Sequence, residues 1–443
     1  MGISIGVGPL TALLFSLLVV TLLTGVPLAV ALGGTSVVVG LLFWGPSSLF
    51  MFPAKALGAM ESIILVAIAL FVLMGCILER SGIADALYEA VYLWLGRLKG
   101  GLAIGTVGIC TIFAAMAGMS APATVTMGLV ALPSMFKRGY SNTIAIGSIA
   151  AGGALGILIP PSITMIVYGM MTGVSVGKLF IGGVFPGLLL AGLFMAYIAV
   201  RCAINPSMGP PIPVERDVSL RVRFAALRSV VLPLALIVAI LGSIYSGIAT
   251  PTEAAAIGAF GSIICAALYR TLNLKNLREA SLEALKLTTM VMWIVIGGYW
   301  FASVFQAIGG SQFAQQLIFS LPFGRWGVLI LMQVTFIFLG MLMDPLGIIF
   351  VTMPVYFPII MELGFDPVWF GVLFIVNMEM AYLTPPFGCN LFYLKAITPK
   401  SVLMMDIYRS CVPFVAIQSI VLIIVMIFPQ IILWLPGQML GGG

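Results

Sequence analysis

Histidine is absent from this chain of 443 residues. The side chain that proteins use most often as a metal ligand, a general base and a proton relay is therefore missing. Charge is also scarce, because Lys, Arg, Asp and Glu make up 8% of the residues, whereas a soluble domain carries about 25%. These absences argue against a soluble protein and against an enzyme that depends on histidine chemistry.

Cysteine pairs and an early positive charge are missing as well. The six cysteines lie apart in apolar runs and form no CxxC motif, so we interpret them as packing residues rather than a redox or metal centre. They are Cys76, Cys110, Cys202, Cys265, Cys389 and Cys411. The first charged residue is Lys55, so the start of the chain lacks the basic region of a cleaved signal peptide. We predict that this segment is a membrane anchor.

Long hydrophobic runs occupy most of the chain. Hydrophobic residues make up 62% of the sequence, and the mean hydropathy is +1.21. Because a membrane helix needs about 20 apolar residues, we predict an all-α polytopic membrane protein with essentially no sheet. The expected spans are about 9–24, 27–44, 58–78, 143–171, 179–202, 229–249, 252–269, 287–308, 370–394 and 411–436.

Two further apolar regions, 101–136 and 326–361, are interrupted by "GMSAPAT" (118–124) and "GMLMDPLG" (340–347). Each could be one poor membrane helix or a re-entrant hairpin. If both are hairpins, all but three of the 20 Lys and Arg fall on one side of the membrane, which the positive-inside rule makes cytoplasmic. The exceptions are Lys55, Lys178 and Arg325. We therefore predict two hairpins that open to opposite sides, with both termini external.

Adjacent prolines interrupt two of the predicted spans. They occur in "GILIPPSITMI" (156–166) and in "AYLTPPFGCNLF" (381–392), and proline inside a helix removes a backbone hydrogen bond. We therefore predict two broken helices, 143–171 and 370–394. The two halves of the chain also match in order, since Gly118, Pro160-Pro161 and Pro186 correspond to Gly340, Pro385-Pro386 and Pro413 at a nearly constant offset.

These features predict two repeats that are inverted with respect to each other, because an odd number of crossings separates their starts. We divide the chain into N-terminal scaffold helices (1–57), a first repeat (58–204), scaffold helices with cytoplasmic amphipathic arms (205–283), and a second repeat (284–436). The basic, amphipathic arms are the loops 205–228 and 270–286, which we expect on the cytoplasmic lipid surface. Inverted repeats with broken helices are typical of secondary transporters.

Lipid cannot satisfy the backbone groups that a helix break leaves unpaired, so such groups survive where they line a site. Free carbonyls at the C-terminus of a half-helix coordinate a cation, and half-helix N-termini attract an anion. We therefore expect the two breaks and the two hairpin tips to meet near the middle of the membrane and to form the transport site.

Polar residues near these breaks are the candidate ligands: Ser120, Thr124, Ser162, Thr164, Asp344, Thr384 and Asn390. Serine and threonine often bond to their own helix backbone instead. Asp344 is different, because a carboxylate within the membrane needs a positive partner and no Lys or Arg lies near either tip or break. A Na⁺ ion held by oxygen ligands is the natural partner, and a protonated or exposed Asp344 is the alternative. Whether Glu379, just before the second break, takes part stays open.

Several motifs resemble the large membrane subunit of tripartite ATP-independent periplasmic (TRAP) transporters, and the resemblance covers nearly the whole chain. They are "LFVLMG" (70–75), "GSIAAGGALGILIPPSITMIVYGMMTGVSVGKLFIGGVFPG" (147–187), "TPTEAAAIGAF" (250–260), "GMLMDPLGIIFVTMP" (340–354) and "TPPFGCNLF" (384–392). The resemblance implies an elevator-type, Na⁺-coupled importer of small organic acids in the bacterial inner membrane. It also implies two partners on separate chains, namely a small four-helix membrane subunit and a periplasmic substrate-binding protein.

The resemblance further implies at least two Na⁺ sites, one at each hairpin. By motif, they carry over to Gly118, Ser120 and the Gly156 region, and to Gly340, Asp344 and Thr384. The first tip departs from the family, which often has a second small polar residue where this chain has Met119, and Pro122 is also unusual.

An organic acid bound without a core arginine would rely on half-helix N-termini and on the side chains of Ser120, Thr124, Ser162, Thr164 and Asn390. A stand-alone Na⁺/dicarboxylate symporter without a binding protein is the main alternative, and a channel fits matched breaks less well. An intramembrane hydrolase would need a histidine, a metal centre or paired aspartates, and Asp344 has no such partner. We therefore expect a lipid-embedded transporter that is not an enzyme and does not bind nucleic acid.

Overall fold

The chain folds into helices joined by short turns, as expected for an all-α protein. The computed structural model describes residues 6–212, 220–226 and 228–439, and these residues contain no strand. The helices are α1 (Val7–Leu23), α2 (Leu28–Trp44), η1 (Gly45–Phe50), α3 (Met51–Met60), α4 (Ile64–Glu79), α5 (Ile83–Leu95), α6 (Gly101–Ala117), α7 (Ser120–Lys137), α8 (Asn142–Ala154), η2 (Leu155–Ile157), α9 (Ile163–Thr172), α10 (Val176–Ile204), η3 (Pro206–Met208), α11 (Leu220–Ala226), α12 (Arg228–Tyr245), α13 (Pro251–Leu268), α14 (Leu274–Ala307), α15 (Gly310–Ser320), α16 (Arg325–Gly340), α17 (Pro345–Glu362), α18 (Pro367–Ala381), α19 (Cys389–Ile397), α20 (Met404–Ile427), α21 (Gln430–Leu433) and η4 (Pro436–Gln438).

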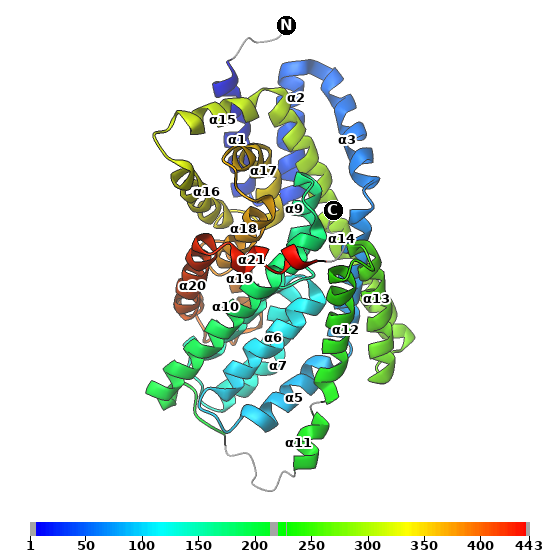
Figure 1. Cartoon of the computed structure of the whole chain (residues 1–443), viewed down its shortest axis with the longest axis vertical. Coiled ribbons are helices and arrows are strands. Elements are labelled where there is room, and N and C mark those ends of the chain that lie inside the picture. The colour runs from blue at the N-terminus through cyan, green and yellow to red at the C-terminus, as the bar shows by residue number, and fades with distance from the viewer. Residues whose placement is uncertain (1–5, 213–219, 227, 440–443) are drawn as a thin grey trace.

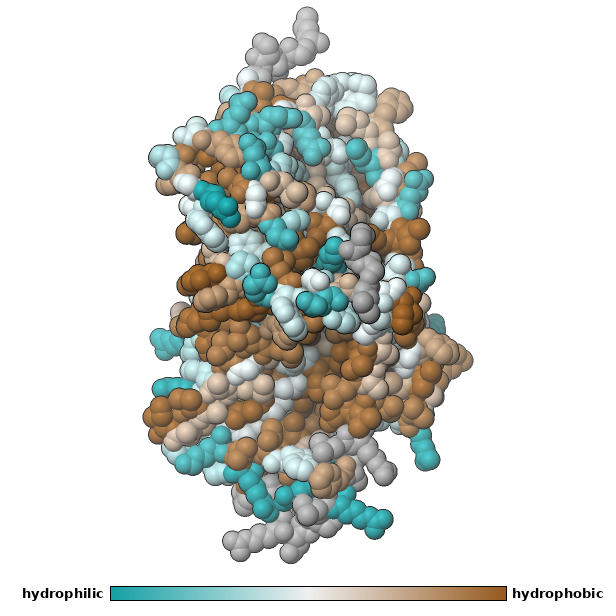
Figure 2. Space-filling view, in the orientation of Figure 1, coloured by the Kyte–Doolittle hydropathy of each residue, from teal (hydrophilic) through white to brown (hydrophobic). Residues whose placement is uncertain are grey.

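The helices have the length and composition of a polytopic membrane protein. Within the described part of the chain, six helices are long and apolar enough to span a bilayer, or up to seven if the bent pair α4–α5 forms one span. Several other predicted spans coincide with shorter apolar helices, because breaks divide 143–171 into α8 and α9 and 370–394 into α18 and α19. Figure 2 shows broad hydrophobic areas on the visible face, with hydrophilic groups toward its upper and lower ends.

Two predicted boundaries fall inside helices of the structure. The second predicted span, 27–44, coincides with α2, but the start of the third, 58–78, falls inside α3, which ends at Met60. The predicted amphipathic arm 270–286 and the span 287–308 form one helix, α14, because no proline interrupts the chain between them. Of the other predicted arm, 205–228, residues 213–219 and 227 lie outside the described residues.

The order of helices is the same in two parts of the chain, α4 to α10 and α14 to α20. Each part has a long helix, a short helix, a hairpin, a broken helix and another long helix. The short helices α5 and α15 each follow a glycine with positive φ, Gly82 at 72° and Gly309 at 77°, a conformation that glycine adopts most readily. In Figure 1, α5 and α15 lie at opposite ends of the molecule, which is the arrangement that inverted repeats require.

The two hairpins, α6–α7 and α16–α17, each contact the broken helix of the other repeat. Helix α7 packs against α8 of its own repeat and against α19 of the second one. Helix α17 packs against α9 of the first repeat and against α18 of its own. This exchange of contacts brings both hairpin tips and both helix breaks into one region.

A wall of helices from outside the hairpins faces this region. Helix α14 runs alongside α2, α3 and α4. The approach to α2 is close, since a Cβ atom on Gly297 would lie 2.6 Å from the carbonyl oxygen of Ala29. Small residues allow membrane helices to pack at such distances. We use the term scaffold wall for the facing parts of α2, α3 and α14.

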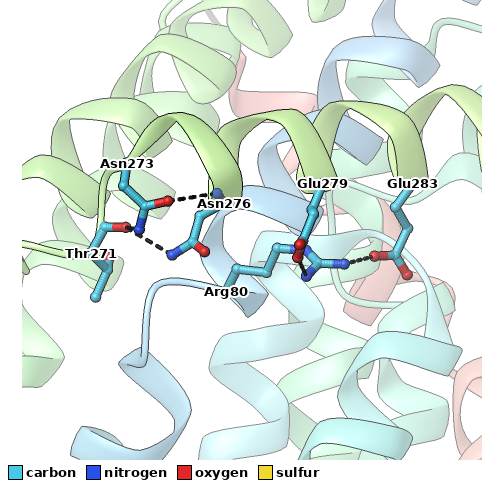
Figure 3. A network of polar contacts seen from close by, with 6 residues as sticks. All are labelled: Arg80, Thr271, Asn273, Asn276, Glu279 and Glu283. Atoms are coloured by element: carbon cyan, nitrogen blue, oxygen red, sulfur yellow. Dashed lines mark hydrogen bonds and ion pairs between the residues drawn. The ribbon is translucent and has the colours of Figure 1, made fainter.

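An ion-pair network ties the scaffold wall to the elbow between α4 and α5 (Figure 3). The guanidinium group of Arg80, directly after α4, donates to Glu279 at 2.9 Å and to Glu283 at 2.5 Å, both on α14. In the same region, the Asn273 side chain caps the start of α14 by accepting from the backbone N–H of Asn276 at 2.8 Å. Arg80 therefore fixes the start of α14 relative to the first repeat.

We expect Arg80→Ala to lower the free energy of unfolding by about 1 kcal/mol, because both ion pairs are partly exposed and such pairs contribute little individually. The exposed fractions of the three side chains are 34% to 43%. Thermal unfolding in detergent, compared with Arg80→Lys as a charge-preserving control, measures the effect. An unchanged midpoint for Arg80→Ala would show that the network does not fix this elbow.

Candidate functional site

The first hairpin tip lies directly against the first helix break. Gly118 ends α6 with a φ of 65°, and a Cβ atom there would lie 2.6 Å from the carbonyl oxygen of Pro161. A Cβ atom on Gly156 would lie 2.3 Å from the carbonyl oxygen of Met119. The backbone N–H of Ile163 donates to the carbonyl oxygen of Gly118 at 3.3 Å. Two glycines therefore allow backbone carbonyls of the tip and the break to come together.

Ser162 joins the two halves of the first broken helix. Its hydroxyl group donates to the carbonyl oxygen of Ile157 at 2.5 Å and accepts from the backbone N–H of Met165 at 3.4 Å. The preceding Pro160–Pro161 peptide bond is cis, as is the Pro385–Pro386 bond of the second break. Ser162 is fully buried and acts here as the N-cap of α9.

A buried side-chain bridge connects the first tip to the second broken helix. The Ser120 hydroxyl at the start of α7 donates to Asn390 Oδ1 at 2.6 Å, and Asn390 Nδ2 donates to the carbonyl oxygen of Ala150 at 3.0 Å. Ser120 is 2% exposed and Asn390 is fully buried. Residues from α7, α19 and α8 thus share one hydrogen-bonded chain across both repeats.

The second hairpin tip lies against the second break in the same way. Asp344 Oδ1 accepts from the backbone N–H of Leu346 at 2.9 Å and caps α17, while Oδ2 accepts from the Tyr382 hydroxyl at 3.1 Å. A Cβ atom on Gly340 would lie 2.3 Å from the Cβ of Ala381. The Thr384 hydroxyl donates to the carbonyl oxygen of Met380 at 2.7 Å. Within the described ranges, Asp344 has neutral donors but no Lys or Arg at ion-pairing distance.

A cavity of about 1070 Å³ lies between the two tips and the scaffold wall. Its polar side is formed by the first tip and the start of α9, including Gly118, Ser120 and Thr164, and by Asp344 and Tyr382 of the second tip and break. The opposite side is formed by apolar residues of α2, α3 and α14. We call this space the central cavity.

Four of the residues that the sequence singled out line the central cavity, namely Gly118, Ser120, Thr164 and Asp344. The others lie behind this lining and do not border the cavity: Thr124, Gly156, Ser162, Gly340, Thr384 and Asn390. Two tyrosines, Tyr382 and Tyr393, line it but were not among the candidates. Their positions beside the second proline pair are the signal that could have identified them.

Two buried polar residues stand apart from the cavity. Thr124 is fully buried, and its hydroxyl has no hydrogen-bond partner among the described residues. Glu379 is also fully buried, and neither of its carboxyl oxygens has a partner in the same part of the chain. Glu379 lies within α18 and does not line the central cavity, so it belongs to the core of the second repeat.

The arrangement can hold ions of both signs. Carbonyl and hydroxyl oxygens with a carboxylate suit a hard cation such as Na⁺, and no group of three or more Cys, Asp or Glu that could hold a metal occurs among the described residues. The first turns of α7 and α9 border the central cavity with backbone N–H groups that attract an anion. The lining therefore has the groups to hold a cation next to an anion.

The family described as "Tripartite ATP-independent periplasmic transporter, DctM component" matches residues 15–431 of the chain. The chain is 38% identical over 406 residues to the C4-dicarboxylate TRAP transporter large permease protein DctM of Pseudomonas aeruginosa, covering 91% of this chain and 93% of that protein. It is 31% identical to the ectoine TRAP transporter large permease protein TeaC of Halomonas elongata, covering 96% of this chain and 99% of that protein.

A solved structure shares the fold. The YdaH transporter of Alcanivorax borkumensis, whose topology is described as unusual, superposes with a TM-score of 0.63 and covers 94% of this chain and 99% of its own. Its sequence identity is 16%, so this likeness concerns the fold alone.

Proposed function

Because the chain belongs to the DctM component family of tripartite ATP-independent periplasmic transporters, we propose that it imports a small organic acid together with Na⁺. Members of this family are transport permeases rather than enzymes, and the chain is a multi-pass inner-membrane protein. Large permeases of the family work with a small membrane subunit and a periplasmic binding protein. The identity of the acid and the coupling ion are the parts that we propose.

The observation that carries the proposal is the environment of Asp344. Its carboxylate lies at the second tip, between the N–H of Leu346 and the hydroxyl of Tyr382, and borders the central cavity. Asp344 is half-buried, and a carboxylate at membrane depth with neutral donors alone is costly to hold in its charged form. A Na⁺ ion would supply the missing charge, with Gly340 and Thr384 as the neighbouring parts of the site.

We place a second Na⁺ at the first tip. Gly118 and Gly156 leave the space that the carbonyl oxygens of Pro161 and Met119 need where the tip meets the break, and Ser120 follows directly in the chain. Oxygen atoms of this kind are ordinary ligands of hard cations. The methionine at position 119 contributes its carbonyl oxygen in this arrangement, so a polar side chain there is not required.

We propose that the acid binds between the two Na⁺ sites. Its carboxylate would meet the N-termini of α7 and α9, together with the hydroxyl groups of Ser120 and Thr164, which border the central cavity. Three residues behind the cavity lining would hold the first tip and the breaks in place without touching the acid, namely Thr124, Ser162 and Asn390. No Lys or Arg from the described residues lines the cavity, so direct affinity for the acid is expected to be weak.

Transport by an elevator movement fits this geometry. The hairpins and broken helices would move as one body, and the apolar scaffold wall of α2, α3 and α14 would remain fixed. An apolar wall can slide past the loaded site without offering polar groups that compete for the ions. Both Na⁺ sites and the acid would then cross together.

The small four-helix membrane subunit and the periplasmic binding protein would be separate chains, and the binding protein would deliver the acid. Uptake of radiolabelled organic acids into proteoliposomes, with the small subunit and with or without the binding protein, tests this assignment. Uptake that requires the binding protein supports the tripartite transporter. Equal uptake without it would instead identify a stand-alone Na⁺/dicarboxylate symporter.

We expect Asn390→Ala to weaken the apparent affinity for Na⁺ by about tenfold. The substitution removes the acceptor of the Ser120 hydroxyl, and a buried polar group left without a partner costs about 1–3 kcal/mol. Asn377→Ala is a matched control, because Asn377 is also fully buried and donates to Gln333 at 2.9 Å, but its hydrogen bonds go to the middle of α16 rather than to a residue at a hairpin tip. Equal effects of both substitutions on the Na⁺ dependence of uptake would show that Asn390 has no special role.

A further inference from the structure

The central cavity is larger than a small dicarboxylic acid needs, and its polar groups lie on one side only. Its volume of about 1070 Å³ lies just above the range for pockets that bind drug-sized molecules, about 300–1,000 Å³. The polar groups gather at the tips and breaks, and the scaffold wall opposite is apolar. A ligand that fills this space must therefore be amphiphilic.

The charges of the lining permit one carboxylate rather than two. Asp344 is the acidic residue that borders the cavity, and no Lys or Arg among the described residues does so. One substrate carboxylate can lie at the first turns of α7 and α9, beside the proposed Na⁺ sites. The two proposed Na⁺ ions and the Asp344 carboxylate together leave one positive charge, which one substrate carboxylate balances. A second carboxylate would lie near Leu28, Phe52 and Ile294 with no charge left to balance it, and burying an unpaired charge against such residues is strongly unfavourable.

The scaffold wall offers aromatic contact area and one unused hydrogen-bond donor. Trp300 on α14 lines the cavity, is 3% exposed, and packs against Phe52 with ring centroids 4.7 Å apart. Its indole N–H has no hydrogen-bond partner in the described ranges. A buried tryptophan usually finds such a partner. An aromatic or branched ligand body would bury apolar surface here, and the face of an aromatic ring can accept a weak hydrogen bond from the indole N–H.

We propose that the substrate of this permease is a monocarboxylate with a bulky apolar body, aromatic or branched, rather than a small dicarboxylate. The carboxylate lies at the hairpin tips, and the apolar body lies against Phe52, Ile294 and Trp300 of the scaffold wall. This assignment rests on the proposed function, since it identifies the class of acid that the same site accepts.

The test uses the full chain together with its small subunit, reconstituted in lipid nanodiscs. Equilibrium dialysis measures the binding of radiolabelled phenylacetate, 4-methyl-2-oxopentanoate and succinate, once in NaCl and once in choline chloride. We expect both monocarboxylates to bind at least about tenfold more tightly than succinate in NaCl. Trp300→Ala should weaken phenylacetate binding about tenfold, whereas Trp300→Phe, which keeps a ring and is the safer variant for folding, should retain most of it. Trp434→Ala, at an outer groove lined by Phe185, serves as the control.

Equal or tighter binding of succinate would overturn the substrate assignment, and so would a Trp300→Ala variant that binds phenylacetate unchanged. A parallel uptake assay with the complete transporter separates this failure from failure of the proposed function. Succinate uptake driven by a Na⁺ gradient, without uptake of the monocarboxylates, would refute the substrate class and leave Na⁺-coupled acid import standing. Absence of any Na⁺-driven acid uptake would refute both.

Discussion

Asp344→Asn is expected to reduce Na⁺-driven uptake to the background of empty liposomes. The substitution keeps an oxygen that can accept from the N–H of Leu346, so the cap of α17 survives. It removes the negative charge that balances the cation. At 4 Å and an effective dielectric constant of about 20, one such charge contributes about 4 kcal/mol, or about a thousandfold in Na⁺ affinity.

Asp366→Asn provides a matched control for this substitution. Asp366 caps α18 in the same manner, because its Oδ1 accepts from the backbone N–H groups of Val368 and Trp369 at 2.8 and 2.9 Å. It does not line the central cavity. Uptake by Asp366→Asn should therefore stay close to that of the unsubstituted protein. An Asp344→Asn variant with unchanged Na⁺ dependence would refute the assignment of Asp344 as a cation ligand.

The second large effect is expected for Gly118→Ala, which should lower uptake by more than tenfold. The added Cβ would lie 2.6 Å from the carbonyl oxygen of Pro161, and backbone atoms cannot move aside as a flexible side chain can. The φ of 65° adds about 1–2 kcal/mol for any residue with a Cβ. The tip must therefore move away from the break, and the carbonyl oxygens of the first cation site separate.

Gly108→Ala is the control for this second prediction, since it lies on the same helix, α6, and nothing stands within 4 Å of its Cβ position. Alanine inside a helix is more favourable than glycine by about 0.5–1 kcal/mol, so this variant should be at least as stable. The test compares the two variants in their uptake rates and in the Na⁺ concentration that gives half-maximal uptake. Full activity of Gly118→Ala would mean that the tip and break need not touch during transport.

The helix breaks and the tips were predictable because their chemistry is local. Adjacent prolines end a helix wherever they occur, and an aspartate within a long apolar run stands out regardless of the fold. The structure has α9 beginning at Ile163, two residues after the first proline pair, and Asp344 at the turn between α16 and α17. The all-helical architecture followed from composition for the same reason.

The far side of the central cavity was not predictable, because it is built from segments that are distant in sequence. Trp300 and Phe52 occur in apolar runs, where the sequence alone does not separate a cavity wall from a lipid-facing surface. The hydrogen bond from Ser120 to Asn390 joins residues of different repeats, and no local sequence pattern predicts it. The continuity of α14 was missed because its charged first part looks like a separate surface arm.

The most direct test of Na⁺-coupled acid import uses the complete transporter in proteoliposomes whose membrane potential is held at zero. Uptake of labelled organic acid is followed with an inward Na⁺ gradient, with equal Na⁺ on both sides, and with choline in place of Na⁺. We predict accumulation above equilibrium with the gradient alone, and loss of that accumulation in the other two conditions. Equal uptake in all three conditions would contradict the account.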